Sequence, residues 1–115
     1  MNDRAVDPAT YRALEDAAGA EFVAELVGTF LDEAPRMTGA LAAALAARDV
    51  ETFRRTAHSL KSNGATFGAL VLAALARDLE QRAAEVVAAG DASALDALLA
   101  EHVRVAGALA ELKDG

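Results

Sequence analysis

His58 and Lys61 are the two residues whose types and spacing most clearly allow chemistry in this sequence. A neutral imidazole carries a lone pair on one ring nitrogen and is a competent nucleophile toward phosphorus. A lysine three residues later lies one helical turn away, where its compact charge can pair with a phosphoryl oxygen. Phosphoryl transfer depends mainly on alignment and charge neutralisation. The pair is compatible with phosphoryl chemistry at His58, and the other interpretation of this stretch is a basic helix face that is merely solvated.

The residues around His58 form one strip along a predicted helix, called the His58 strip below. Steps of three and four residues relate them, so they lie about 100° away from the apolar stripe that faces the core. Ser62 and Ala65 are small, which leaves the imidazole open to a large partner. Arg54 and Arg55 are interpreted as docking charges, although they also fit a merely solvated face. The strip consists of Arg54, Arg55, His58, Lys61, Ser62 and Ala65, and the apolar stripe of Phe53, Ala57, Leu60 and Gly64.

Charge sets this segment apart from the rest of the chain. The 115 residues carry a formal net charge of −7, yet residues 36–67 contain five basic and only two acidic side chains. Nucleic-acid binding draws its affinity from a broadly basic surface, so the overall charge argues against a nucleic acid as partner. We therefore expect a protein partner.

Several other kinds of site are missing from the sequence. It has no cysteine, so thiol nucleophiles, disulfides and cysteine-ligated zinc are excluded. It has no Gly-rich phosphate loop and no acidic cluster on the His58 strip, so we expect neither ATP nor a metal ion to bind. The longest apolar runs, residues 40–47 and 69–76, are too short to span a membrane. No secretion signal opens the chain, and we expect a soluble, cytoplasmic protein.

Helices must position the strip, because the composition favours no other element. The chain has 31 Ala, 15 Leu and no Ile, and Ala and Leu are strong helix formers. Pro35 lies inside the second predicted helix and either kinks or breaks it. Caps and breakers predict helices over residues 8–18, 20–47, 50–67 and 69–88 and a fifth helix after Asp91, with ends marked by Asp7-Pro8, Gly19, Asp49, Gly68 and Gly90.

Short connections make neighbouring helices antiparallel. We therefore predict an all-α fold, an antiparallel up-down four-helix bundle with a short additional N-terminal helix, forming one domain over residues 1–115. His102 falls in the apolar stripe of the last helix and is interpreted as a packing or rim residue. Besides the stripe above, the expected core consists of Phe22, Leu26, Phe30, Met37, Leu41, Leu45, Phe67, Leu72, Leu75, Leu79, Ala83, Val86, Leu95, Leu98, Val105, Leu109 and Leu112.

The stretch Ala-His-Ser-Leu-Lys-Ser-Asn-Gly-Ala-Thr-Phe-Gly-Ala, residues 57–69, resembles the signature of histidine-containing phosphotransfer (HPt) domains. A looser resemblance extends over most of the chain and implies the same kinked-helix bundle. The resemblance implies that His58 carries the phosphoryl group, that Lys61 assists it, and that Gly68 allows a close approach between helices.

Two residues depart from the family pattern, which commonly has Gly at position 62 and Ser at position 63. Ser62 is still small, so access to His58 is kept. Its hydroxyl either bonds the phosphoryl group or bonds back along the helix. The supporting residues of the expected site are Ser62, Asn63, Gly64 and Gly68.

The resemblance implies a histidine phosphotransfer module of a multistep two-component phosphorelay. In that role His58 accepts a phosphoryl group from a receiver aspartate or a kinase and passes it to another receiver aspartate. The expected partners are response-regulator receiver domains and a histidine kinase, hybrid or simple, and the receiver supplies Mg²⁺. The chain is then a monomeric phosphoryl carrier without a kinase or ATPase site of its own.

Two other functions fit a helical bundle with an exposed histidine. One is a non-catalytic adaptor. The other is the dimerisation and phosphoacceptor module of a sensor histidine kinase, in which an acidic residue typically follows the phosphorylated histidine; here Ser59 follows His58. A di-iron bundle is excluded because the sequence has no Glu-x-x-His pair. The Met1 start and the short length favour a stand-alone protein over a fragment of a larger kinase.

Overall fold

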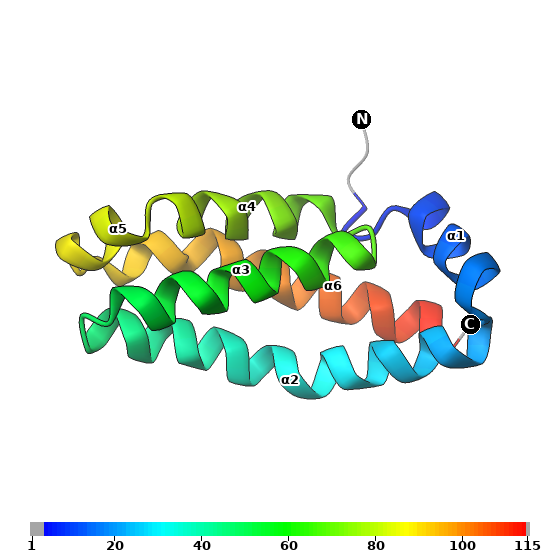
Figure 1. The fold of residues 1–115 in the computed structure, drawn as a ribbon. Helices are drawn as coiled ribbons and strands as arrows, with labels where there is room; N and C mark the ends of the chain where they lie inside the picture. Colours follow the sequence, from blue (N-terminus) through cyan, green and yellow to red (C-terminus); the bar gives the residue numbers. More distant parts are fainter. Residues whose placement is uncertain (1–3, 115) are drawn as a thin grey trace.

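The structure, a computed structural model, describes residues 4–114, and most of these residues lie in six α-helices. Four helical arms run antiparallel, and the short first helix lies across one end of them (Figure 1). The predicted all-α bundle with an additional N-terminal helix is confirmed. In this part of the chain no helix has the length and apolar character needed to cross a membrane. The elements are α1 (Pro8–Ala18), α2 (Ala20–Ala46), α3 (Val50–Thr66), α4 (Leu70–Gln81), α5 (Ala83–Ala89), the 3₁₀ turn η1 (Ala92–Leu95) and α6 (Asp96–Asp114).

The start of α3, the helix that carries His58, is fixed by its cap. Asp49 accepts a hydrogen bond from the Thr52 N–H at 3.1 Å, which satisfies one of the unpaired donors of the first turn. Asp7 precedes α1 as expected, but its carboxylate accepts the Thr10 hydroxyl at 2.7 Å and no backbone N–H.

The two helical segments that flank α3 differ in continuity: α2 is one helix, whereas the segment after α3 is divided into α4 and α5. α2 is continuous through Pro35, so this proline does not break the helix. The predicted single helix over residues 69–88 is wrong, because the chain leaves helical geometry at Arg82, with φ −102° and ψ 16°, and so separates α4 from α5. The Arg82 guanidinium spans the interruption, contacting Asp78 at 2.9 Å and Glu85 at 3.2 Å. No Gly or Pro marks this position, so the sequence pattern did not reveal it.

One hydrophobic core runs through the bundle and fixes the rotation of α3. Phe53 and Leu60 are fully buried, as predicted. Phe30 of α2 and Phe67 meet edge to face, with ring centroids 5.6 Å apart. Burial of each large apolar side chain contributes roughly 1.5–3 kcal/mol. This packing leaves the His58 strip, which lies to one side of the buried stripe of α3, facing solvent.

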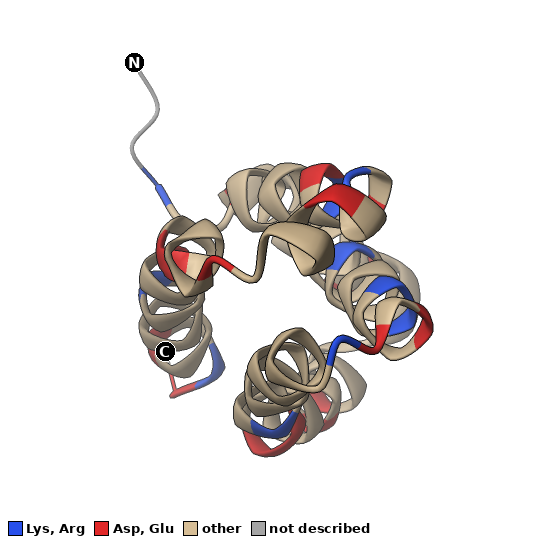
Figure 2. Ribbon diagram, turned by 90° about the vertical axis from the view of Figure 1, so that its left-hand side faces the viewer, with Lys and Arg blue, Asp and Glu red and all other residues tan. Residues whose placement is uncertain are grey.

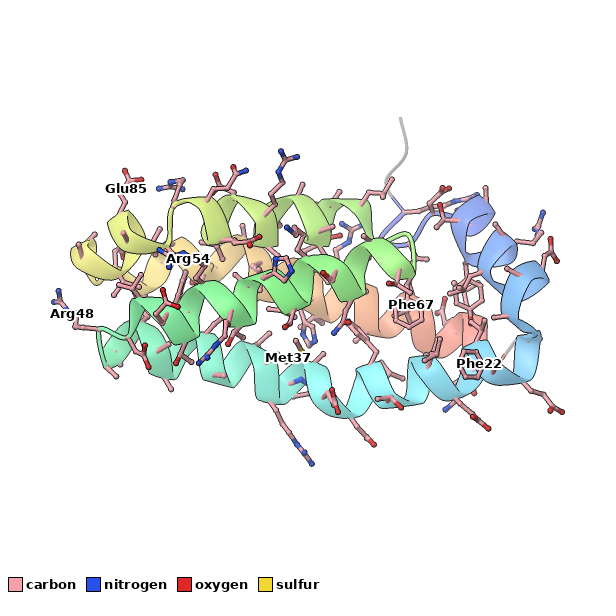
Figure 3. The ribbon with its side chains drawn as sticks, in the orientation of Figure 1. Phe22, Met37, Arg48, Arg54, Phe67 and Glu85 are labelled. Carbon is pink, nitrogen blue, oxygen red and sulfur yellow. The ribbon has the colours of Figure 1, made fainter. Side chains whose placement is uncertain are left out.

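Two predicted core residues are exposed. Phe22 is 51% exposed and Leu112 is 37% exposed. Phe22 lies in the first turn of α2, beside α1 (Figure 3), where the next residue, Val23, is fully buried instead. The buried stripe of α2 therefore begins at Val23, and the predicted phase was wrong for Phe22. Leu112 has the phase of the buried Val105 and Leu109 but lies in the last turn of α6, where the core ends.

Glycines allow the closest approaches around α3. A Cβ at Gly64 would lie 3.3 Å from both Ala69 O and Ala73 N, so α3 and α4 touch backbone to backbone there. Gly68 has φ +78°, and a Cβ on it would lie 2.7 Å from Thr10 Cβ of α1. Gly64 therefore allows the close approach of α3 to α4. Gly68 forms the turn between these two helices and lies against α1.

Candidate functional site

His58 lies on the outer face of α3, as its position in the helical pattern predicts. Its side chain is 57% exposed, and Nδ1 lies 2.8 Å from Oε2 of Glu80 on α4. Within residues 4–114 this is the one hydrogen bond of the imidazole. Nε2 is therefore the ring nitrogen that a partner can reach.

Lys61 contacts the same carboxylate from the next turn of α3. Its Nζ lies 2.9 Å from Oε1 of Glu80, and the side chains of Lys61 and Glu80 are 31% and 20% exposed. The two carboxylate oxygens of Glu80 thus contact different groups: Oε2 faces the imidazole of His58, and Oε1 faces the ammonium of Lys61. The structure joins the predicted nucleophile and the predicted cation through a third residue.

Sequence reasoning missed Glu80. We considered only acidic residues on the His58 strip itself, which carries none, and Glu80 is 22 residues further along the chain. The available signal was topological: α4 returns antiparallel from the turn at Gly68, and its approach to Gly64 sets the register that brings residue 80 opposite His58. One carboxylate does not make a metal site, and the described residues contain no group of three His, Cys, Asp or Glu side chains placed to hold a metal ion.

The contacts of Glu80 decide the protonation pattern of the site. Hydrogen bonding from Lys61, followed by that from His58, holds the pKa of the Glu80 carboxyl below its usual value. Glu80 is therefore an ionised acceptor at neutral pH, and Nδ1 must carry the proton that faces it. This tautomer leaves the lone pair on Nε2.

The two predicted docking arginines differ in their surroundings. The Arg54 guanidinium lies 2.6 Å from the Glu51 carboxylate, so its charge is already paired (Figure 3). Arg55 Nη2 lies 3.4 Å from the Thr52 hydroxyl, and Arg55 forms no ion pair with any described residue. Ala65, the third predicted docking residue, is exposed on the same face.

The two residues that depart from the HPt motif point in different directions. Ser62 is exposed beside His58, and its carbonyl accepts the Thr66 hydroxyl at 3.0 Å. Among the described residues its own hydroxyl forms no hydrogen bond, so it does not bond back along the helix. Asn63 turns toward α2, where Nδ2 lies 3.8 Å from Met37 Sδ. Asn63 therefore belongs to the contact between α2 and α3 and lies away from the imidazole.

A groove of about 480 Å³ runs between α2 and α3 beside the site. It brings Arg36, which sequence reasoning did not single out, to the same groove as Arg55. Figure 2 shows basic residues on the ribbon of α3, and both basic and acidic residues on the other helices. The groove extends to Ser59, the residue after His58. Its lining consists of Glu33, Arg36, Met37, Ala40, Arg55, Thr56 and Ser59.

His102 packs inside the bundle, as predicted. Its ring centroid lies 6.2 Å from that of Phe30. Nε2 is buried without a partner among residues 4–114, and burial holds the pKa of His102 below its ordinary value. His102 is therefore a neutral packing residue and is not part of the His58 site.

Comparisons with known proteins bear on the family and the fold. The sequence model of the Hpt domain matches residues 25–115. The crystal structure of histidine-containing phosphotransfer protein B (HptB) from Pseudomonas aeruginosa PAO1 has the same fold, with a TM-score of 0.87 over 98% of this chain and 97% of that one, at 23% sequence identity. No curated protein matches the sequence closely enough to count as a relative.

The fold and the site together define a class of protein. It is a helical phosphotransfer bundle with an exposed histidine that is hydrogen-bonded to a carboxylate. Because the match covers most of the sequence, the chain belongs to the Hpt domain family. It serves as a histidine phosphotransfer module of phosphorelays.

Proposed function

We propose that His58 is the phosphoacceptor, taking a phosphoryl group from a receiver aspartate or a histidine kinase and passing it to another receiver aspartate. The observation that carries this proposal is the double contact of Glu80 with His58 and Lys61. It places a tautomer-fixing acid and a cation beside one exposed imidazole. His102, the other histidine of the sequence, is packed against Phe30.

The transfer step uses atoms that the site already positions. Nε2 of His58 attacks phosphorus, a P–N bond forms, and the P–O bond to the aspartate breaks with its electron pair leaving on the carboxylate. The Nδ1 proton stays on the ring, so the product is a phosphoimidazolium that faces Glu80. In the return step an aspartate oxygen attacks phosphorus, and the P–N electron pair goes back to Nε2. Neither step consumes a proton or a water molecule.

The partner supplies the rest of the catalytic machinery. Mg²⁺ belongs to the receiver, whose acidic site holds the reacting aspartate, and this chain binds neither a nucleotide nor a metal of its own. It acts as a phosphoryl carrier without kinase or ATPase activity, as a monomer, in the cytoplasm with its kinase and receivers.

The surface around His58 supports docking of an acidic partner. Arg55 and Arg36 line the groove together with Glu33, and neither arginine forms an ion pair with a described acidic side chain. Ser62 and Ala65 are small and exposed, which lets a large surface come close to the ring. Electrostatic complementarity of this kind raises association rates and selects partners.

The test mixes the purified protein with phosphorylated receiver domains and follows the label. The wild type should gain acid-labile, base-stable phosphate, and His58→Gln should gain none. The variant should keep its circular dichroism and lie within about 0.5 kcal/mol of wild-type stability, since the side chain is exposed. Label remaining on a folded His58→Gln protein would contradict the assignment. A non-catalytic adaptor would gain no label, and a kinase dimerisation module would sediment as a dimer.

A further inference from the structure

The carboxylate of Glu80 is shared between the nucleophile and the cation of the site. Oε2 lies 2.8 Å from His58 Nδ1, and Oε1 lies 2.9 Å from Lys61 Nζ. Lys61 and Glu80 are largely covered, which strengthens their attraction relative to that of fully exposed charges. When His58 is in its neutral, nucleophilic form, the charges of Lys61 and Glu80 cancel each other.

Phosphorylation changes the charges on both sides of the imidazole. The phosphoryl group brings about two negative charges to Nε2. The ring keeps its Nδ1 proton and becomes positive, and this positive charge faces Glu80. The carboxylate then has a cation in direct hydrogen-bond contact even without Lys61. The ammonium of Lys61, one turn from His58, is drawn more strongly by the doubly charged phosphoryl group than by the already neutralised carboxylate.

We propose that Lys61 changes partner when His58 is phosphorylated, leaving Glu80 for the phosphoryl group while Glu80 pairs with the imidazolium. This inference rests on the proposed function, because it requires a phosphoryl group on His58. Every charge then has an opposite neighbour in both states. Glu80 is a positioning residue in this scheme, since it acts through His58 and Lys61 and touches no reacting atom.

The exchange is reversible. Phosphorylation breaks the Lys61–Glu80 pair and replaces it by a pair between Glu80 and the imidazolium. Release of the phosphoryl group to a receiver removes the charge on the ring and lets the Lys61–Glu80 pair form again.

The lysine content of the chain makes the exchange observable. Lys61 and Lys113 are the two lysines of the sequence, so NMR of ¹⁵N-labelled lysine ammonium groups gives one signal from the site and one internal reference. Phosphoramidate, a small phosphoryl donor, phosphorylates His58 without any receiver. The Lys61 signals of wild type and Glu80→Gln should differ before phosphorylation and converge after it. The Lys113 signal should stay constant throughout.

The lifetime of the phosphorylated protein provides a second measurement. Glu80→Gln removes the carboxylate that holds the proton on Nδ1, and the ring is a poorer leaving group from phosphorus when it lacks that proton. Its phosphohistidine should therefore hydrolyse roughly two- to fivefold more slowly than that of wild type, which corresponds to the energy of a partly exposed charge pair. Glu85→Gln is the matched control, because Glu85 pairs with Arg82 away from the site. It should leave both the Lys61 signal and the lifetime unchanged.

Specific outcomes separate this inference from the proposed function. If wild type and Glu80→Gln show the same Lys61 signal before phosphorylation, or if their difference persists after it, the partner exchange is overturned. If phosphorylated receivers label His58 while that difference persists, the relay function stands without the exchange. If receivers fail to donate but phosphoramidate labels His58 and the difference disappears, the exchange stands and the relay function falls.

Discussion

The two histidines of this chain occupy opposite environments. His58, on the outer strip of α3, is 57% exposed and faces the Glu80 carboxylate. His102, on α6, packs against Phe30, and burial lowers its pKa. The first ring has a fixed proton on one nitrogen and an accessible lone pair on the other, whereas the second has a buried nitrogen that no partner reaches. Phosphoryl chemistry therefore follows from the neighbours of a histidine, and changes near each ring should affect different measurements.

The largest effect is expected from Lys61 on the outer strip. Lys61→Ala should slow phosphoryl transfer by about 10–1000-fold without unfolding the domain, as expected when one electrostatic contributor to a transferring group is removed. Lys61→Arg should recover part of this loss, because it keeps the charge but changes its shape. Lys113→Ala, at the far end of α6, is the matched control. A wild-type transfer rate for Lys61→Ala would show that this lysine is only a surface charge.

The next effect concerns packing and should appear in stability before transfer. Gly68→Val should lower the free energy of unfolding by more than about 1 kcal/mol, because a Cβ there meets Thr10 and the positive φ is strained for valine. Gly39→Ala is the control, since a Cβ at Gly39 meets nothing within 4 Å. Thermal unfolding of both variants measures the difference. Equal stability of the two would refute the role assigned to the turn.

A smaller and purely local effect is expected at Ala65. Ala65→Glu should leave stability unchanged but weaken receiver binding, because it adds a negative charge where an acidic partner approaches. The loss, measured by titration calorimetry, should shrink as salt rises and screens that charge. Unfolding of this variant would show that the assigned outward face of α3 is wrong.

The smallest effect is the pH dependence that His102 contributes. Its pKa is lowered in the folded protein from the ordinary value of 6.5, so its contribution to stability is present above that value and is lost as pH falls below it. Wild type should therefore lose more stability between pH 7 and pH 5 than His102→Gln does. The lowered pKa values of Glu80, Asp49 and Asp91 start from 4.5 or 3.8, so these groups act at lower pH. Identical pH profiles would contradict the assignment.

Local periodicity was enough to predict the outer strip from the sequence. The spacing of Phe53, Ala57 and Leu60 fixed which side of α3 is buried, and the placement of His58 and Lys61 followed from it. Asp49 and Gly90 marked helix ends for equally local reasons. These features depend on residues within a few turns of one helix.

The features that escaped prediction depend on contacts between helices. Glu80 reaches His58 only because α4 packs against α3 in one register, which no single-helix pattern contains. The interruption at Arg82 lacks a Gly or Pro signal. Phe22 was placed on the buried stripe of α2, but the neighbouring Val23 is fully buried and Phe22 is exposed. Register and bundle length are properties of the assembled fold.

The uneven charge of the chain gives the molecule a polarity that acts before contact. Residues 36–67 carry five basic and two acidic side chains, a net charge of +3, which leaves −10 on the remainder of a chain whose total is −7. An approaching acidic partner is repelled by most of the surface and attracted toward α3, so it turns during diffusion until the productive faces meet. Such steering accelerates encounter, and it weakens as ionic strength rises. The distribution of charge thus sets how often a collision finds the histidine.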